Sequence, residues 1–137
     1  MALARIEVLE GRTPAEKQSL LEAVRAALSE ALQAPRDDPA VRLAEYPREQ
    51  FLLPYPDHYT LVEVTMFAER LLETKRRLCD AIIQRLATLG VPSSDVLIVL
   101  HGPPMENWAV NGAYRRAKSM SASRSTSDRP FWSSRVR

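Results

Sequence analysis

The sequence is poor in the residues that support disulfide, cofactor and membrane architectures. Cys79 is the only cysteine, which excludes an intrachain disulfide and predicts a reducing, cytoplasmic compartment. No uninterrupted apolar run approaches the roughly 18 residues of a membrane span, and no charged-then-apolar leader opens the chain, so neither a membrane location nor secretion is expected. The sequence also lacks a GxGxxG motif, a P-loop and a Cys/His cluster. We therefore expect no cofactor and no metal.

The net charge of the chain is also low. The formal charge is +2, and residues 119–137 alone carry four Arg against one Asp, which leaves the preceding residues close to neutral. The same segment holds seven Ser and shows no hydrophobic period, so it is predicted to be a disordered basic tail. Its SASRSTSDR stretch (121–129) has neither interleaved aromatic side chains nor a folded basic face, and nucleic acid is not an expected partner.

The first half of the chain has the pattern of a strand, a helix and a second strand. Residues 3–9 (LARIEVL) alternate apolar and polar side chains, which predicts a strand. Thr13-Pro14-Ala15-Glu16 is typical of a helix start, with Thr as the N-cap and Glu closing a capping box. An apolar stripe follows until the helix must stop before Pro35. Residues 40–46 (AVRLAEY) predict the next strand.

The second half repeats this order. Strands are predicted at 60–67 and 95–101, on either side of an amphipathic helix that Gly90 ends. An offset of 58 positions aligns the two halves and pairs Arg12 with Arg70, Lys17 with Lys75, Leu20 with Leu78 and Val24 with Ile82. So many matches at one spacing predict a duplication. We expect one domain over residues 1–118, made of repeats at about 2–58 and 59–113.

The repeats predict an α+β fold. Two right-handed β-α-β crossovers place both helices on one face of a four-stranded mixed sheet. The other face is then uncovered, although the strand at 95–101 is apolar on both sides. The simplest cover is another copy of the chain, so we expect a homo-oligomer.

Particular motifs resemble a known family. The LEGR-T-P-x-E-K start (9–17), the repeated unit and the ENWAVNG close (106–112) are similar to the tautomerase superfamily, the 4-oxalocrotonate tautomerase-like proteins. The doubled unit resembles the longer, fused members, such as malonate semialdehyde decarboxylase and cis-3-chloroacrylic acid dehalogenase. This resemblance implies the MIF-like fold, a homotrimer, a small carboxylate substrate and no cofactor. It also implies an N-terminal proline, exposed by removal of Met, whose amine moves a proton.

The chain departs from that family at the proline. Ala2 stands in its place. Removal of Met1 would leave a primary amine, which can abstract a proton or form a Schiff base but lacks the ring that orients the lone pair. Retention of Met1 would displace the amine by about 3.3 Å along a strand, and the family chemistry should then fail.

The resemblance implies roles for three arginines. Arg70 matches the arginine that fused members use on the substrate carboxylate, and it is a catalytic candidate. Arg12 is the same position in the first repeat and a candidate for substrate binding, or else a solvated turn residue. Arg42, on the strand at 40–46, is a second substrate-binding candidate whose alternative is an ordinary surface position.

Three further residues complete the candidate site. Asp38 matches the aspartate that the decarboxylase type places beside its proline, and it is a catalytic candidate for activating water; its alternative is a loop acid. Trp108 and Val110, within ENWAVNG, match the apolar wall of the substrate pocket. Such a wall disfavours charge on a nearby amine. Trp108 also suits an oligomer interface, and the two roles are compatible.

Two functions follow from this reading. The first is an isomerase-type enzyme that catalyses keto–enol tautomerisation, or a related hydration or decarboxylation, of a small 2-oxo or unsaturated carboxylic acid, weakened by loss of the proline. The second is a non-catalytic relative that binds a small carboxylate or serves an interaction role. Retention of Arg12 and Arg70 favours the first, and Ala2 favours the second.

Overall fold

The structure, a computed structural model, describes residues 2–52 and 59–114. Its main sheet contains β1 (Ala2–Leu9), β2 (Ala40–Tyr46), β3 (Thr60–Met66) and β4 (Val96–His101) in the order β2-β1-β3-β4. The inner pair β1–β3 is antiparallel, whereas each outer strand is parallel to its inner neighbour. The predicted four-stranded mixed sheet is confirmed. The tail predicted at 119–137 lies outside the described residues.

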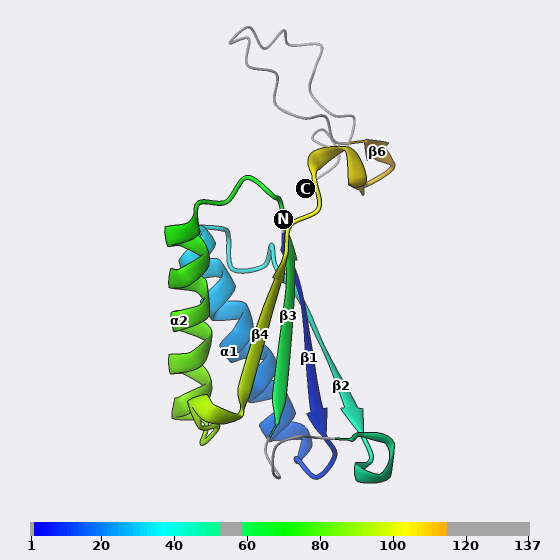
Figure 1. The fold of residues 1–137 in the computed structure, drawn as a ribbon, viewed down its shortest axis with the longest axis vertical. Coiled ribbons are helices and arrows are strands. Elements are labelled where there is room, and N and C mark those ends of the chain that lie inside the picture. Colours follow the sequence, from blue (N-terminus) through cyan, green and yellow to red (C-terminus); the bar gives the residue numbers. More distant parts are fainter. Residues whose placement is uncertain (1, 53–58, 115–137) are drawn as a thin grey trace, which may run out of the picture.

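Both helices, α1 (Pro14–Leu32) and α2 (Leu72–Thr88), lie on one side of the sheet, as predicted (Figure 1). The predicted capping box at the start of α1 is present: the Thr13 hydroxyl accepts from the Glu16 N–H at 3.1 Å, and the Thr13 N–H donates to the Glu16 carboxylate at 3.5 Å. The start of α2 has no side-chain cap because Leu71 occupies the N-cap position. The stability of α2 therefore depends on tertiary packing more than the stability of α1 does.

The core fills the space between the helices and the sheet. Alternate residues of β1 and β3 point toward the helices, and all of them are buried. They meet the apolar stripes of α1 and α2, which include Leu20, Val24, Leu28, Leu78, Ile82 and Leu86. Burial of each large aliphatic side chain contributes about 1.5–3 kcal/mol. Because the period-2 and period-3.6 stripes meet face to face, one core holds both repeats together.

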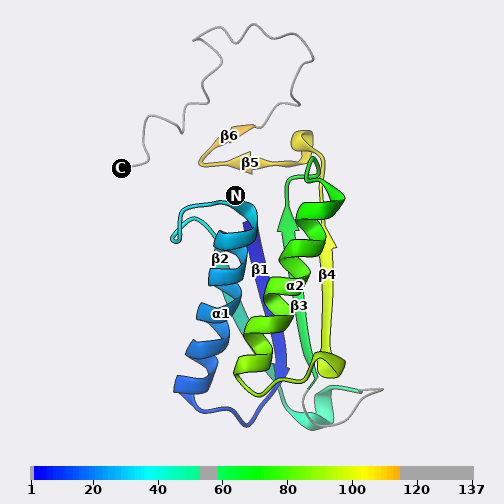
Figure 2. The ribbon, with the colours of Figure 1, turned by 90° about the vertical axis from the view of Figure 1, so that its left-hand side faces the viewer.

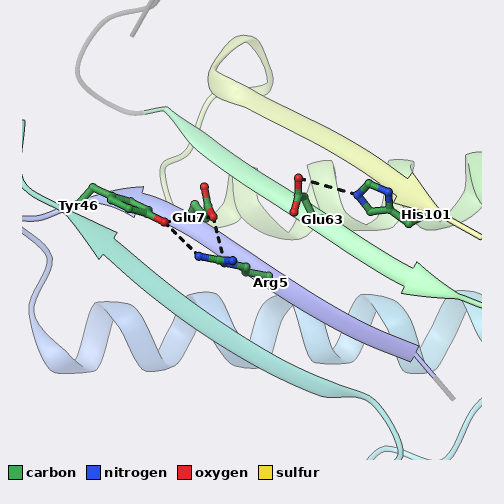
Figure 3. A network of polar contacts seen from close by, with 5 residues as sticks. All are labelled: Arg5, Glu7, Tyr46, Glu63 and His101. Atoms are coloured by element: carbon green, nitrogen blue, oxygen red, sulfur yellow. Dashed lines mark hydrogen bonds and ion pairs between the residues drawn. The ribbon is translucent and has the colours of Figure 1, made fainter. Parts of the chain in front are cut away.

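The face of the sheet opposite the helices is more polar than the sequence suggested. Arg5 on β1 forms an ion pair with Glu7 at 3.0 Å and donates to the Tyr46 hydroxyl at 3.1 Å, and that hydroxyl donates to Glu7 at 3.3 Å. Glu63 and His101 lie 3.9 Å apart on the neighbouring strands (Figure 3). On β4, Leu97 is 46% exposed. A mixed apolar and charged surface is thus left without cover in the single chain.

A small hairpin, which the sequence analysis did not predict, follows β4. Its strands are β5 (Ala109–Val110) and β6 (Ala113–Tyr114), and Figure 2 shows them beyond the end of the main sheet. Asn111 and Gly112 connect them with φ values of 53° and 79°, which is the geometry of a type I′ turn. The Asn-Gly pair was the sequence signal for this hairpin, although strands of two residues are too short for an alternating pattern to show.

Short 3-10 turns follow three of the prolines. The turns η1 (Arg48–Gln50), η2 (Ser93–Asp95) and η3 (Met105–Asn107) have Pro47, Pro92 and Pro104 as their N-caps.

Within the described ranges, neither helix is long and apolar enough to cross a membrane.

Candidate functional site

The antiparallel pairing of β1 and β3 decides which residues share an end of the sheet. Ala2 is paired in register with Met66, so the start of β1 lies beside the end of β3. The parallel pairs bring the start of β2 and the end of β4 to the same edge, which we call the Ala2 end. Figures 1 and 2 show the hairpin β5–β6 at this end.

Five of the seven candidate residues belong to elements at the Ala2 end. Ala2 is the first residue of β1, and Asp38 precedes β2. Arg70 lies in the loop between β3 and α2, while Trp108 and Val110 follow β4. The fold alone therefore collects residues from positions 2 to 110 at one edge.

Ala2 has apolar surroundings. It is 2% exposed and belongs to the hydrophobic core cluster, together with its strand partner Met66, which is 1% exposed. Apolar surroundings disfavour the charged form of an amine. The position therefore suits a group that must be neutral to act as a base.

An aromatic pair builds the wall of this end. The rings of Trp108 and Phe67 meet edge to face at a centroid distance of 4.8 Å, and the Trp108 indole N–H donates to the Pro103 carbonyl oxygen at 3.0 Å. A side chain at Gly102 would come within 3.2 Å of the Ala68 Cα, so the chain passes close to the loop after β3. Phe67 is not among the residues predicted from the sequence.

Arg70 remains available to a ligand. It is half-buried, and it takes part in no hydrogen bond or ion pair within the part of the chain that the structure describes. A guanidinium presents paired N–H donors that match a carboxylate. Asp38 differs in that it is exposed, and its backbone N–H donates to the Pro35 carbonyl oxygen at 3.0 Å.

The other two candidates lie elsewhere. Arg12 follows the far end of β1, and the seven steps from Ala2 to Leu9 span roughly 23 Å. Arg42 is exposed on β2, in register with Arg5 of the uncovered sheet face. A single chain thus does not bring Arg12 to Ala2, and a role for Arg12 there requires another copy. Arg42 lies two residues along β2 from the strand's start at the Ala2 end.

Cys79 is a weak candidate for chemistry. Burial, and secondly the neighbouring Asp80 carboxylate, raise the pKa of the Cys79 thiol, which makes it a poorer nucleophile. Among residues 2–52 and 59–114, no three His, Cys, Asp or Glu side chains gather closely enough to hold a metal ion.

Comparison with known proteins agrees with this geometry. Two family models, each described as tautomerase enzyme, match residues 3–54 and 52–111. The chain is 28% identical to the probable tautomerase YusQ of Bacillus subtilis (strain 168) over 119 residues, which are 80% of this chain and 92% of YusQ.

Solved structures give the same relationship. A fused 4-OT that forms a symmetric trimer superposes with a TM-score of 0.74 at 29% identity and covers 82% of this chain and 94% of its own. FG41 malonate semialdehyde decarboxylase gives a TM-score of 0.70 at 27% identity, with coverage of 78% and 87%. The sheet order and the position of both helices are those of the fused tautomerase fold. The chain belongs to the tautomerase superfamily.

Proposed function

We propose that this protein catalyses keto–enol tautomerisation of a small 2-oxo carboxylic acid, with the amine of Ala2 as acid and base after removal of Met1. One observation carries this proposal: the buried Ala2 position, the Trp108–Phe67 wall and Arg70, which has no partner among the described residues, all belong to one end of the sheet. A proton-transfer group, a carboxylate anchor and an apolar wall are what the reaction needs.

Each residue has a defined part in the reaction. Arg70 binds the substrate carboxylate and holds the adjacent carbonyl in place. The neutral amine of Ala2 removes a proton from the carbon next to the carbonyl and becomes an ammonium, while the carbonyl oxygen gains a proton from water to give the enol. The ammonium then passes its proton to the hydroxide left by that water, which restores the neutral amine. In the reverse direction the amine takes a proton from water and passes it to carbon, and the enol hydroxyl gives its proton to the hydroxide. General acid–base transfer of this kind contributes typically about 10²–10⁴-fold in rate.

The surroundings of Ala2 support the required protonation state. Burial lowers the pKa of an amine because the charged form loses hydration. Trp108 and Val110, which are 8% and 7% exposed, would help to exclude water. Without a proline ring the lone pair is less well oriented, so turnover should be weaker than that of a proline enzyme.

Hydration or decarboxylation needs an additional group that activates water. Asp38 is the candidate at the Ala2 end, and a decarboxylase is among the similar structures. Asp38 is exposed, however, and tautomerisation makes no demand on it. We therefore place tautomerisation first among the three reactions.

The second candidate function is binding without catalysis, and Ala2 itself favours it, since the residue that carries the family chemistry is replaced. The Arg70 pocket would then hold a small carboxylate without turning it over. In either case we propose a cytoplasmic homotrimer. The uncovered sheet face and the trimeric assembly of the similar fused 4-OT support this assembly.

Intact mass and a ketonisation assay test the proposal together. The purified protein should lack Met1, and it should speed ketonisation of phenylenolpyruvate above the buffer rate. Arg70→Ala should lose at least tenfold in kcat/KM, because a charge-assisted hydrogen bond contributes about 1.5–3 kcal/mol. Arg76→Ala is the matched control, since Arg76 is exposed on α2. A retained Met1, or a wild-type rate equal to that of buffer, would favour binding without catalysis.

A further inference from the structure

A cavity of about 370 Å³ lies at the end of the molecule opposite Ala2. We call this the Arg12 end, where β1 stops and β3 begins. Its walls come from the loop between β1 and α1, from η1 and from the segment that follows α2. The cavity therefore combines parts of both repeats.

The cavity presents an unpaired cation. Arg12 is half-buried, and in the described ranges it forms no hydrogen bond or ion pair. Two acidic residues lie near it along the chain: Glu16 is occupied in the capping box with Thr13, and Glu10 makes no ion pair with Arg12 within those ranges. The five N–H donors of the Arg12 guanidinium thus have no partner among residues 2–52 and 59–114.

The rest of the lining limits what a ligand can be. Leu9, Leu89 and Val91 offer apolar surface next to the guanidinium, and Arg48 adds a second positive charge. Glu10 and Glu16 also line the cavity, so two carboxylates stand beside the two guanidinium groups and would repel a ligand with further negative groups. A single carboxylate on a small apolar body matches this combination of charge and surface.

The internal duplication explains why such a site exists. The inner strands are antiparallel and each outer strand is parallel to its neighbour, so the two repeats are related by an approximate two-fold rotation. The 58-position offset that pairs Arg12 with Arg70 also pairs Ala2 with Thr60. Thr60 is completely buried and its nitrogen is in a peptide bond with Tyr59. The Arg12 end therefore has the arginine of the Ala2 end but not a free amine.

We propose that the Arg12 end is a second binding site for small apolar monocarboxylates, one that holds its ligand without proton transfer. This site does not depend on the chemistry proposed for Ala2, since none of the cavity-lining residues belongs to that end.

Selective ¹⁵N-glycine labelling of the full chain can test both ends at once. The sequence has only four glycines. Gly11 and Gly90 line the cavity, whereas Gly102 and Gly112 follow β4 at the Ala2 end. The probe is 3-phenylpropanoate, a monocarboxylate that has no ketone to enolise. Titration should shift the Gly11 and Gly90 amide signals in a saturable manner.

Two matched variants decide the outcome. Arg12→Ala should weaken binding reported by Gly11 and Gly90 roughly tenfold to a hundredfold, and the unchanged Gly102 and Gly112 signals would show that it folds. Arg70→Ala should leave the titration of Gly11 and Gly90 intact. If Gly11 and Gly90 do not respond in the wild type, or respond equally in Arg12→Ala, the second site does not exist.

A third outcome would also overturn the inference. If Arg12→Ala and Arg70→Ala each abolish the response of all four glycines, both arginines serve one composite site between copies of the chain. The ketonisation assay remains a separate readout, so failure of the second site leaves the function proposed for Ala2 untouched.

Discussion

Trp108 holds the segment after β4 through two contacts that can be removed separately. Its edge-to-face contact with Phe67, at a centroid distance of 4.8 Å, is of a kind that contributes about 0.5–1.5 kcal/mol beyond burial. Its indole N–H donates to Pro103 at 3.0 Å, and such a bond contributes about 0.5–1.5 kcal/mol net. Trp108→Phe removes only the hydrogen bond, whereas Trp108→Ala removes both contacts.

These contacts set the expected size of the effect. Local stability should fall by about 1 kcal/mol in Trp108→Phe and by at least about 2 kcal/mol in Trp108→Ala, which also loses the burial of the ring. The equilibrium constant for opening of the neighbouring turn η3 should then rise about fivefold and at least about thirtyfold, since roughly 1.4 kcal/mol is tenfold. The assay is hydrogen exchange at the Asn107 amide, which donates to the Pro104 carbonyl oxygen at 2.9 Å. Its intrinsic exchange rate does not depend on the side chain at 108.

The control is Tyr114→Ala, because Tyr114 is 85% exposed on β6 and should leave Asn107 exchange unchanged. Equal exchange in Trp108→Phe and Trp108→Ala would refute the contribution of the Phe67 contact. Wild-type exchange in both variants would refute the whole account of how this segment is held.

Three further predictions concern stability and thiol reactivity. Thr13→Ala should cost about 1 kcal/mol in urea unfolding through loss of the N-cap, while Thr13→Ser should stay near wild type; equal loss in both would contradict the cap. Leu28→Ala should lower the free energy of unfolding by about 2–5 kcal/mol, since Leu28 is 0% exposed. The control Leu52→Ala should lower it by less than about 0.5 kcal/mol, since Leu52 is fully exposed; similar losses in the two variants would place Leu28 outside the core. Because burial and Asp80 raise the pKa of Cys79, iodoacetamide at mildly alkaline pH should alkylate it more slowly than a free thiol, and Asp80→Asn should speed the reaction. Alkylation of the folded protein as fast as in urea would contradict the raised pKa. Because the raised pKa favours the neutral thiol in the folded state, its contribution to stability is fully present below the thiol pKa of the unfolded chain and is lost as the pH rises through the thiol pKa of the folded chain.

Much of the fold could be read from local patterns. The capping box at Thr13 and the alternation in 3–9 predicted their elements because each depends on neighbouring residues. The matching of Arg12 with Arg70 at an offset of 58 positions predicted that the order of elements repeats. The hairpin β5–β6 escaped this reading, since its strands of two residues are too short to show a period. Phe67 escaped it as well, because its contact with Trp108 joins positions 41 residues apart.

The sequence by itself determined both helices, the four strands of the main sheet, the matching of the two halves and the identity of the candidate residues, including Ala2 in place of proline. Only the tertiary structure decided which of them meet. Because β1 and β3 are antiparallel, the start of β1 lies beside the end of β3. Arg70, which follows β3, therefore belongs to the Ala2 end. The same pairing sends Arg12 to the opposite end, beside its own cavity. The two arginines are equivalent in sequence, and strand direction, a property of the assembled sheet, separates them.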